Sequence, residues 1–240
     1  MSSIIRSTTI LPANRAAITI HTQDNLNLVG EVASPKGVRI ASILCLHPLP
    51  THGGMMDSHI LRKAAFRLPE LAGIEVIRFN TRGTTSEQGT SEGTFDFGVS
   101  EKYDVEAAVE YAFTEARVER LWVVGWSFGT DLALKYARDP RIEGLILLSP
   151  PLRSSEPSDL DFWAADGRPI TAVVPEFDEF LKPAEALVKF AAIPQIEIIP
   201  VDGAKHLWVG EPSVYRVLNE ITALVSPRKY PLPTEWSAVS

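Results

Sequence analysis

The sequence LWVVGWSFGT, residues 121–130, decides the predicted fold because an apolar run ends there in GWSFG and a helical pattern follows. The apolar residues 121–124 predict a buried strand, and residues 131–137 place small and apolar side chains at helical spacing. Between them, the two glycines of the G-x-S-x-G pattern permit a turn so tight that the serine takes a strained backbone conformation. The stretch therefore predicts a strand, a sharp turn carrying Ser127, and a helix.

This position would make Ser127 a nucleophile. Its hydroxyl would project above the carboxyl edge of a sheet, beside the free N–H groups and the positive dipole end of the following helix, which favour a developing oxyanion. The same five-residue pattern also occurs as an ordinary structural turn, and the pattern alone leaves that alternative open. The predicted strand before it and the predicted helix after it favour the nucleophile.

Strands and helices are predicted to alternate along most of the chain. Two β-prone stretches, 17–22 and 26–32, predict an antiparallel pair at the start. Later strands are predicted at 40–46, 75–79, 121–124, 145–148, 170–174 and 196–201, and helices at 58–68, 101–116, 131–137, 181–190 and 213–225. This alternation predicts one α/β domain over residues 1–240, with a core at about 17–225, a mostly parallel sheet and helices on both faces.

The remaining segments are predicted to lack regular structure. Residues 80–100 predict a long loop of functional importance. Pro69 is expected to end the helix predicted at 58–68. The polar segment between Ser149 and Ile170 is too short for a separate lid domain. Residues 226–240, which contain three prolines, predict a tail on the surface or a partly disordered end.

Composition limits the classes of partner. The chain has 23 Lys and Arg residues against 30 Asp and Glu residues, a formal net charge of −7, which argues against nucleic acid or an anionic membrane and favours a small-molecule substrate. No signal peptide or membrane-spanning run is predicted, so we expect a cytoplasmic protein. The single cysteine, Cys45, is expected to be a buried strand residue. Oligomeric state is not predicted.

A serine nucleophile needs a general base and an acid that orients the base. Asp178 follows one predicted strand and His206 follows another, so both fall at the carboxyl edge of the sheet, where ligands bind in open α/β folds. Glu176 and Glu179 flank Asp178, and all three could be solvated loop carboxylates. Asp202 is the alternative acid.

The chain order Ser127, Asp178, His206 resembles the nucleophile, acid and histidine order of the α/β-hydrolase superfamily. The stretch HPLPTHGGMMD at 47–57, together with Arg-Gly at 82–83, is similar to a small, lid-less, dienelactone-hydrolase-like branch whose members are mostly esterases or uncharacterised. The resemblance extends from about residue 17 to 225. It implies an α/β-hydrolase fold, a Ser-Asp-His triad and a reaction without cofactor or metal.

The resemblance also implies an oxyanion hole made of two backbone N–H groups. One belongs to the residue after the nucleophile, Phe128, and the other to the loop after the third strand. Pro48 and Pro50 have no N–H, so Leu49 is the candidate donor between the strand end and Thr51.

Other residues near these loops have competing interpretations. Trp126 and Trp208 adjoin the candidate catalytic residues and could line an acyl pocket, although core packing explains a tryptophan equally well. A metal site is not predicted, because no zinc pattern matches the spacing of His47, His52, Asp57 and His59.

The sequence as a whole predicts a serine hydrolase that cleaves a carboxylic ester through an acyl-enzyme on Ser127. Short acyl chains are expected, because without a lid there is less apolar wall to bury a long chain. Thioester or amide hydrolysis would use the same residues, and the fold also occurs in non-catalytic binding proteins. The loops at 81–99 and 150–168 carry no readable specificity motif, so the acyl and leaving groups are not predicted.

Overall fold

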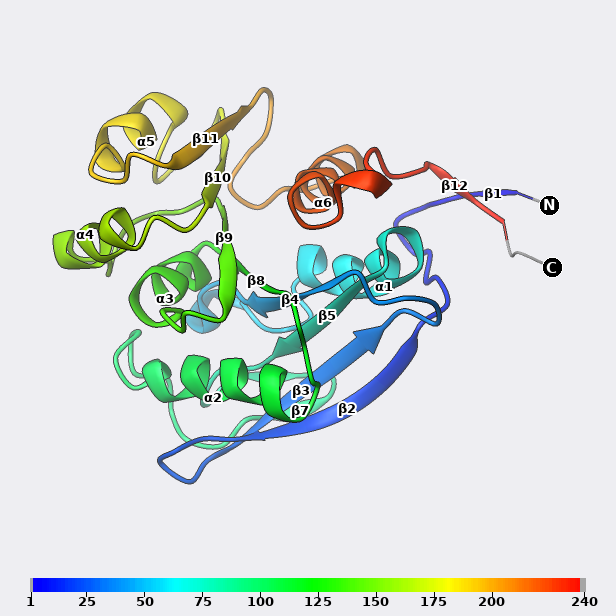
Figure 1. The fold of residues 1–240 in the computed structure, drawn as a ribbon, viewed down its shortest axis with the longest axis horizontal. Helices are drawn as coiled ribbons and strands as arrows, with labels where there is room; N and C mark the ends of the chain where they lie inside the picture. Colours follow the sequence, from blue (N-terminus) through cyan, green and yellow to red (C-terminus); the bar gives the residue numbers. More distant parts are fainter. Residues whose placement is uncertain (1, 238–240) are drawn as a thin grey trace.

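An eight-stranded sheet forms the centre of the computed structural model, which describes residues 2–237 (Figure 1). Its strands are β2 (Asn14–His21), β3 (Asn27–Ser34), β4 (Ala41–Leu46), β5 (Ile74–Phe79), β8 (Leu121–Trp126), β9 (Ile142–Leu148), β10 (Ile170–Pro175) and β11 (Ile196–Val201). They lie in the order β11-β10-β9-β8-β4-β5-β3-β2. Strand β3 is antiparallel to β2 and to β5, and the pairs from β5 to β11 are parallel. The predicted sheet and its antiparallel starting pair are confirmed.

Helices cover both faces of the sheet, as predicted (Figure 1). One face packs against α1 (His59–Ala72) and α6 (Glu211–Val225), and the other against α2 (Glu101–Thr114), α3 (Phe128–Tyr136), α4 (Pro157–Asp166) and α5 (Pro183–Lys189). The sequence of β4 is uniformly apolar because both faces of this strand are buried. Leu44 and Leu46 lie in the core on one side of the sheet, and Ile43 and Cys45 lie in the core on the other. Cys45 is buried, as predicted, and burial raises the pKa of its thiol to about 12.

Two proline-containing segments are more helical than predicted. Helix α1 does not stop before Pro69 but continues to Ala72, and Gly73 ends it with a φ of 64° and an N–H bonded to the Leu68 carbonyl. Pro69 is buried on the core side of the helix, so packing offsets the hydrogen bond that it cannot make. Helix α4 lies in a segment predicted to be irregular.

The sequence did contain a signal for α4. Pro157 stands at the start of the helix, and the N–H of Glu156 donates to the Asp159 side chain at 2.7 Å, which closes a capping box. Trp163 is fully buried and donates its indole N–H to the Leu134 carbonyl at 2.8 Å. The connection between β9 and β10 therefore forms one short helix that packs on α3.

The C-terminal segment lies on the surface from residue 227 to 237, as one of the two predictions for it states, and it is held there by specific contacts; residues 238–240 of the predicted tail lie outside the described residues. Strand β12 (Glu235–Trp236) pairs with β1 (Ser3–Ile4), so the two ends of the chain lie side by side (Figure 1). Leu232 is buried, its N–H donates to Asn219, and its carbonyl accepts from the Tyr215 hydroxyl. Such long-range contacts leave no local sequence signal.

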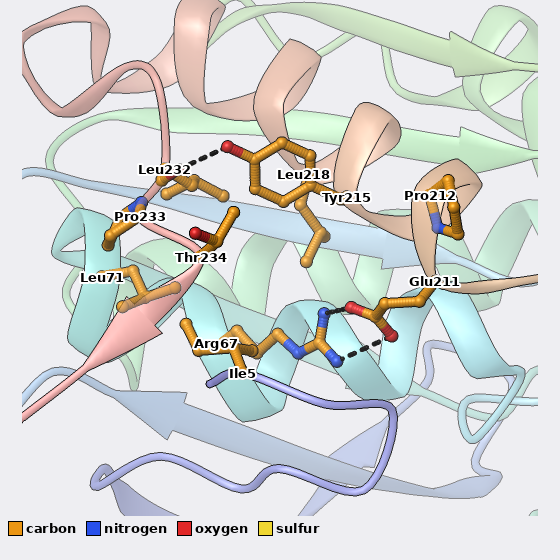
Figure 2. Close-up of a pocket in the computed structure, with 10 residues that line it drawn as sticks. All are labelled: Ile5, Arg67, Leu71, Glu211, Pro212, Tyr215, Leu218, Leu232, Pro233 and Thr234. Atoms are coloured by element: carbon orange, nitrogen blue, oxygen red, sulfur yellow. Dashed lines mark hydrogen bonds and ion pairs between the residues drawn. The ribbon is translucent and has the colours of Figure 1, made fainter. Parts of the chain in front are cut away.

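These terminal segments close a pocket of about 250 Å³ over α1 and α6, in which Arg67 pairs with Glu211 (Figure 2). Short elements complete the fold: the 3-10 turns η1 (Pro50–His52) and η2 (Pro227–Lys229), and a hairpin of β6 (Thr85–Ser86) and β7 (Gly89–Thr90). The hairpin lies in the predicted 80–100 loop. No helix among residues 2–237 is long and apolar enough to cross a membrane.

Candidate active site

Ser127 occupies the sharp turn between β8 and α3 with φ 53° and ψ −120°, a conformation that L-residues rarely adopt. Both flanking glycines are required by close packing. A Cβ on Gly125 would lie 2.5 Å from the Gly129 carbonyl oxygen, and a Cβ on Gly129 would lie 2.1 Å from the Leu46 carbonyl oxygen. The Ser127 N–H is held by the Leu148 carbonyl at 2.9 Å. The turn thus fixes the serine at the carboxyl edge of the sheet.

The structure brings the three candidate catalytic side chains together. His206 lies in the loop after β11, and its Nε2 is 2.8 Å from the Ser127 Oγ. Asp178 lies in the loop after β10, and its Oδ2 is 2.9 Å from the His206 Nδ1. Three parallel strands therefore place an alcohol, an imidazole and a carboxylate in one hydrogen-bonded chain.

The surroundings of Asp178 favour its ionised form. Its side chain is buried, and Oδ1 accepts the N–H of Phe180 at 2.9 Å and that of Leu181 at 3.3 Å. Burial alone would raise the pKa of Asp178, but the hydrogen bonds from His206 and from these N–H groups outweigh it and hold the pKa below its ordinary value. Asp178 is thus a carboxylate at neutral pH and can accept a hydrogen bond from a protonated Nδ1 of His206.

The other acidic candidates lie elsewhere. Glu176 is exposed and accepts the Gly203 N–H at 2.7 Å, which ties the acid loop to the histidine loop. Asp202 and Glu179 are exposed as well. The carboxylate that contacts the His206 imidazole is that of Asp178.

The two candidate oxyanion donors lie in the same cavity as Ser127. Phe128 is the first residue of α3, and Leu49 precedes the turn η1. Among residues 2–237, neither of their N–H groups donates a hydrogen bond to the protein. Gly54 keeps the second loop tight, because a Cβ there would lie 2.0 Å from the Pro48 carbonyl oxygen. Both N–H groups are therefore available to a ligand oxygen.

His47 holds this loop in place, a role that sequence reasoning did not assign to it. The residue is buried directly after β4, its Nε2 accepts the Thr81 N–H at 3.1 Å, and its Nδ1 is 2.7 Å from the Pro48 carbonyl oxygen. A carbonyl only accepts, so Nδ1 carries the proton. Burial lowers the pKa of His47 to about 4, and the neutral imidazole bridges β4, the loop after β5 and the Leu49 loop.

This buried histidine predicts acid lability. Between about pH 6.5 and 4 the unfolded chain binds a proton at His47 that the folded chain does not, so the free energy of unfolding falls as pH falls through this window. The shift corresponds to on the order of 3 kcal/mol. Denaturant titrations at several pH values should show this loss, and His47→Gln should flatten it. An unchanged slope in His47→Gln would assign the acid lability to other groups.

The cavity beside Ser127 has a volume of about 480 Å³ and an aromatic lining. Its phenyl rings are those of Phe95, Phe97, Phe128 and Phe180, and the ring of Phe180 packs edge-on against the His206 imidazole, with centroids 4.5 Å apart. The buried Glu101 carboxylate accepts hydrogen bonds from the backbone N–H groups of Asp96 and Gly98, and it thereby holds the loop that carries Phe95 and Phe97.

Of the two interpretations of Trp126 and Trp208, core packing is the correct one. Trp126 and Trp208 are buried in the core on the α1 and α6 side and do not line the aromatic cavity beside Ser127. Trp126 instead donates its indole N–H to the His206 carbonyl at 3.2 Å, which supports the histidine loop from the core.

The structure does not assemble His47, His52, Asp57 and His59 into a metal site. Residues 2–237 hold no group of three or more potential metal ligands.

Comparison with known proteins identifies the class of this chain. Residues 42–199 match the family model of the alpha/beta hydrolase fold, and the chain belongs to this family. XC6422 from Xanthomonas campestris, described as an α/β serine hydrolase without a lid, is 26% identical over 94% of this chain and 99% of its own, with a TM-score of 0.73. A serine hydrolase homologue from Coxiella burnetii is 25% identical over 92% of this chain and 99% of its own, with a TM-score of 0.72.

More distant proteins share the fold. Esterase Pf2001 from Pyrococcus furiosus is 18% identical, covers 91% of this chain and 98% of its own, and has a TM-score of 0.71. Uncharacterized protein RP471 from Rickettsia prowazekii is 32% identical over 123 residues, and the match spans half of each chain. These likenesses support a serine hydrolase of the lid-less α/β-hydrolase branch.

Proposed function

We propose that the protein hydrolyses a carboxylic ester through an acyl-enzyme on Ser127. The observation that carries the proposal is the chain of contacts from the Ser127 Oγ to His206 Nε2, at 2.8 Å, and from His206 Nδ1 to Asp178, at 2.9 Å. A serine at this distance from a neutral imidazole can lose its proton as it attacks, and the ionised Asp178 favours the tautomer that accepts it.

The reaction follows from these positions. The Ser127 Oγ attacks the ester carbonyl carbon while its proton moves to His206 Nε2, and the N–H groups of Leu49 and Phe128 stabilise the oxygen that becomes negative. When the tetrahedral intermediate collapses, the C–O bond to the alcohol breaks and His206 returns the proton to the leaving oxygen. Water then attacks the acyl-enzyme with His206 as base, which releases the acid and restores Ser127.

A substrate panel tests the proposal. We expect hydrolysis of p-nitrophenyl esters, measured as kcat/KM beside a matched thioester and a matched anilide, with the esters the best substrates. Preference for the thioester or the anilide would retain the three residues but change the reaction class. No turnover of any of them by folded protein would favour a non-catalytic binding protein of the same fold.

Short acyl chains should be preferred. The connection between β9 and β10 forms only the short helix α4, and the cavity beside Ser127 has a volume of about 480 Å³. Each methylene group of the acyl chain contributes ~0.8 kcal/mol of binding free energy only if apolar side chains of the cavity bury it. We therefore expect kcat/KM to be highest for acetyl to butyryl esters. A continuous rise through to the palmitoyl ester would contradict this expectation.

A further inference from the structure

A second hollow of about 760 Å³ adjoins the aromatic cavity. We call the aromatic cavity the apolar arm and the second hollow the polar arm. The two share Pro48, His52 and Leu207 as their common border. The polar arm is further lined by residues that include Asp57, His59, Arg62 and Val209. Ser127 and His206 line the apolar arm, and the border residue Leu207 follows His206 directly in the chain.

The positions of the reacting groups assign one part of an ester to each arm. Ser127 and Phe128 line the apolar arm, where the phenyl rings gather, so the acyl chain lies there. The alcohol must leave beside the His206 imidazole, because that imidazole returns its proton. His206 itself lines the apolar arm, but Leu207 and Val209, from the same loop, line the polar arm, which is the second hollow within reach of a group that leaves beside His206. The alcohol portion therefore extends into the polar arm.

The side chains of the polar arm are suited to hydroxyl groups. His59 Nε2 is 3.1 Å from the Trp208 carbonyl oxygen and therefore donates to it, which leaves Nδ1 as an acceptor. Burial lowers the pKa of His59, which keeps the ring neutral. Arg62, on the next turn of α1, adds a guanidinium donor. A hydroxyl, which both donates and accepts, can use both side chains.

Asp57 adds a further acceptor to the same arm. One of its carboxylate oxygens is paired with buried Arg78. The other, Oδ2, is buried and has no hydrogen-bond partner among residues 2–237. A buried acceptor without a donor is unfavourable, so this carboxylate keeps an unmet capacity for a hydrogen bond beside the arm.

We propose that the substrate is an ester of a small apolar acid with a polyhydroxylated alcohol, the acyl group lying in the apolar arm and the alcohol in the polar arm. The inference rests on the proposed ester hydrolysis and adds the class of the leaving group. It also predicts that the two ends of the substrate are recognised by different residues, His59 and Arg62 for the alcohol and Phe97 for the acyl chain.

Two esters of the same acid test this inference on the full chain: 2,3-dihydroxypropyl butyrate and propyl butyrate. Both form the same butyryl-enzyme, so their kcat/KM values differ only through binding and acylation. We expect the dihydroxypropyl ester to be preferred. Arg62→Met and His59→Phe should each reduce that preference, the ratio of the two kcat/KM values, by roughly two- to tenfold, the contribution of one hydrogen bond.

Matched variants locate the effect. Lys63→Met changes the neighbouring residue on α1, which lines neither arm, and should leave the preference unchanged. Phe97→Ala should weaken the dependence on acyl chain length without altering the alcohol preference. Equal rates for the two esters, or a preference that both Arg62→Met and His59→Phe leave unchanged, overturns the inference. If p-nitrophenyl butyrate is not hydrolysed either, the proposed function fails instead.

Discussion

Replacing Ser127 by alanine is expected to lower kcat by on the order of 10³-fold or more while leaving the fold intact. Among residues 2–237, the Ser127 hydroxyl forms a hydrogen bond only with His206, and alanine keeps the Cβ that the turn already accommodates. The loss would therefore come from the missing nucleophile and not from unfolding. Initial rates with p-nitrophenyl butyrate, together with thermal unfolding of both proteins, measure the two effects separately.

Ser154→Ala is the matched control, because Ser154 lines the same cavity and its hydroxyl has no hydrogen-bond partner among residues 2–237. This variant should retain near wild-type kcat. Undiminished turnover in purified Ser127→Ala would remove Ser127 from the mechanism.

Replacing Asp178 by asparagine should lower kcat about 10³- to 10⁴-fold. An amide has nearly the shape of the carboxylate, but its NH₂ group is a hydrogen-bond donor. It can face His206 Nδ1 only if that nitrogen accepts a hydrogen bond, and the imidazole proton then lies on Nε2, toward Ser127. The base would then be in the wrong tautomer. Glu176→Gln and Glu179→Gln should stay near wild type, because neither side chain contacts the imidazole.

The ionisation of Asp178 also predicts a pH dependence. The lowered pKa of Asp178 keeps its side chain ionised well below neutral pH, so the difference in kcat between the wild type and Asp178→Asn should not shrink as the pH falls from 7 to about 5. If Asp202→Asn is the damaging change and Asp178→Asn is mild, the acid has been placed in the wrong loop.

The sequence was most informative where a short segment carries its own structural requirement. The turn around Ser127 could be predicted from the G-x-S-x-G pattern between a strand and a helix, in which Gly125 is needed by a contact with Gly129 and Gly129 by a contact with the neighbouring strand β4. Asp178 and His206 could be placed because parallel strands bring their carboxyl ends to one edge. Their meeting therefore followed from strand order and not from any contact visible in the sequence.

Features that depend on distant partners were not predictable in this way. Helix α1 passes through Pro69 because its burial offsets a lost hydrogen bond, and the C-terminal segment is ordered by contacts with α6 and with the N-terminal strand. The indole of Trp126 supports the histidine loop from the core and does not line the aromatic cavity beside Ser127. In each case, tertiary packing outweighed the local preference.

The residues that line the cavity beside Ser127 could not be predicted from the sequence either. Phe95 and Phe97 are aromatic residues in a loop predicted without regular structure, and their position beside Ser127 depends on the hydrogen bonds from the N–H groups of Asp96 and Gly98 to buried Glu101. His47 likewise acts through contacts with separate loops.

Covalent labelling with a fluorophosphonate tests the central claim most directly. The reagent phosphonylates an activated serine, and intact mass followed by peptide mapping shows how many groups are attached and where. We expect one adduct per chain, on the peptide that contains Ser127, with loss of hydrolysis in proportion to labelling and no adduct in Ser127→Ala. An adduct on a different residue, or hydrolysis that persists in fully labelled protein, would contradict the assignment of Ser127 as the nucleophile.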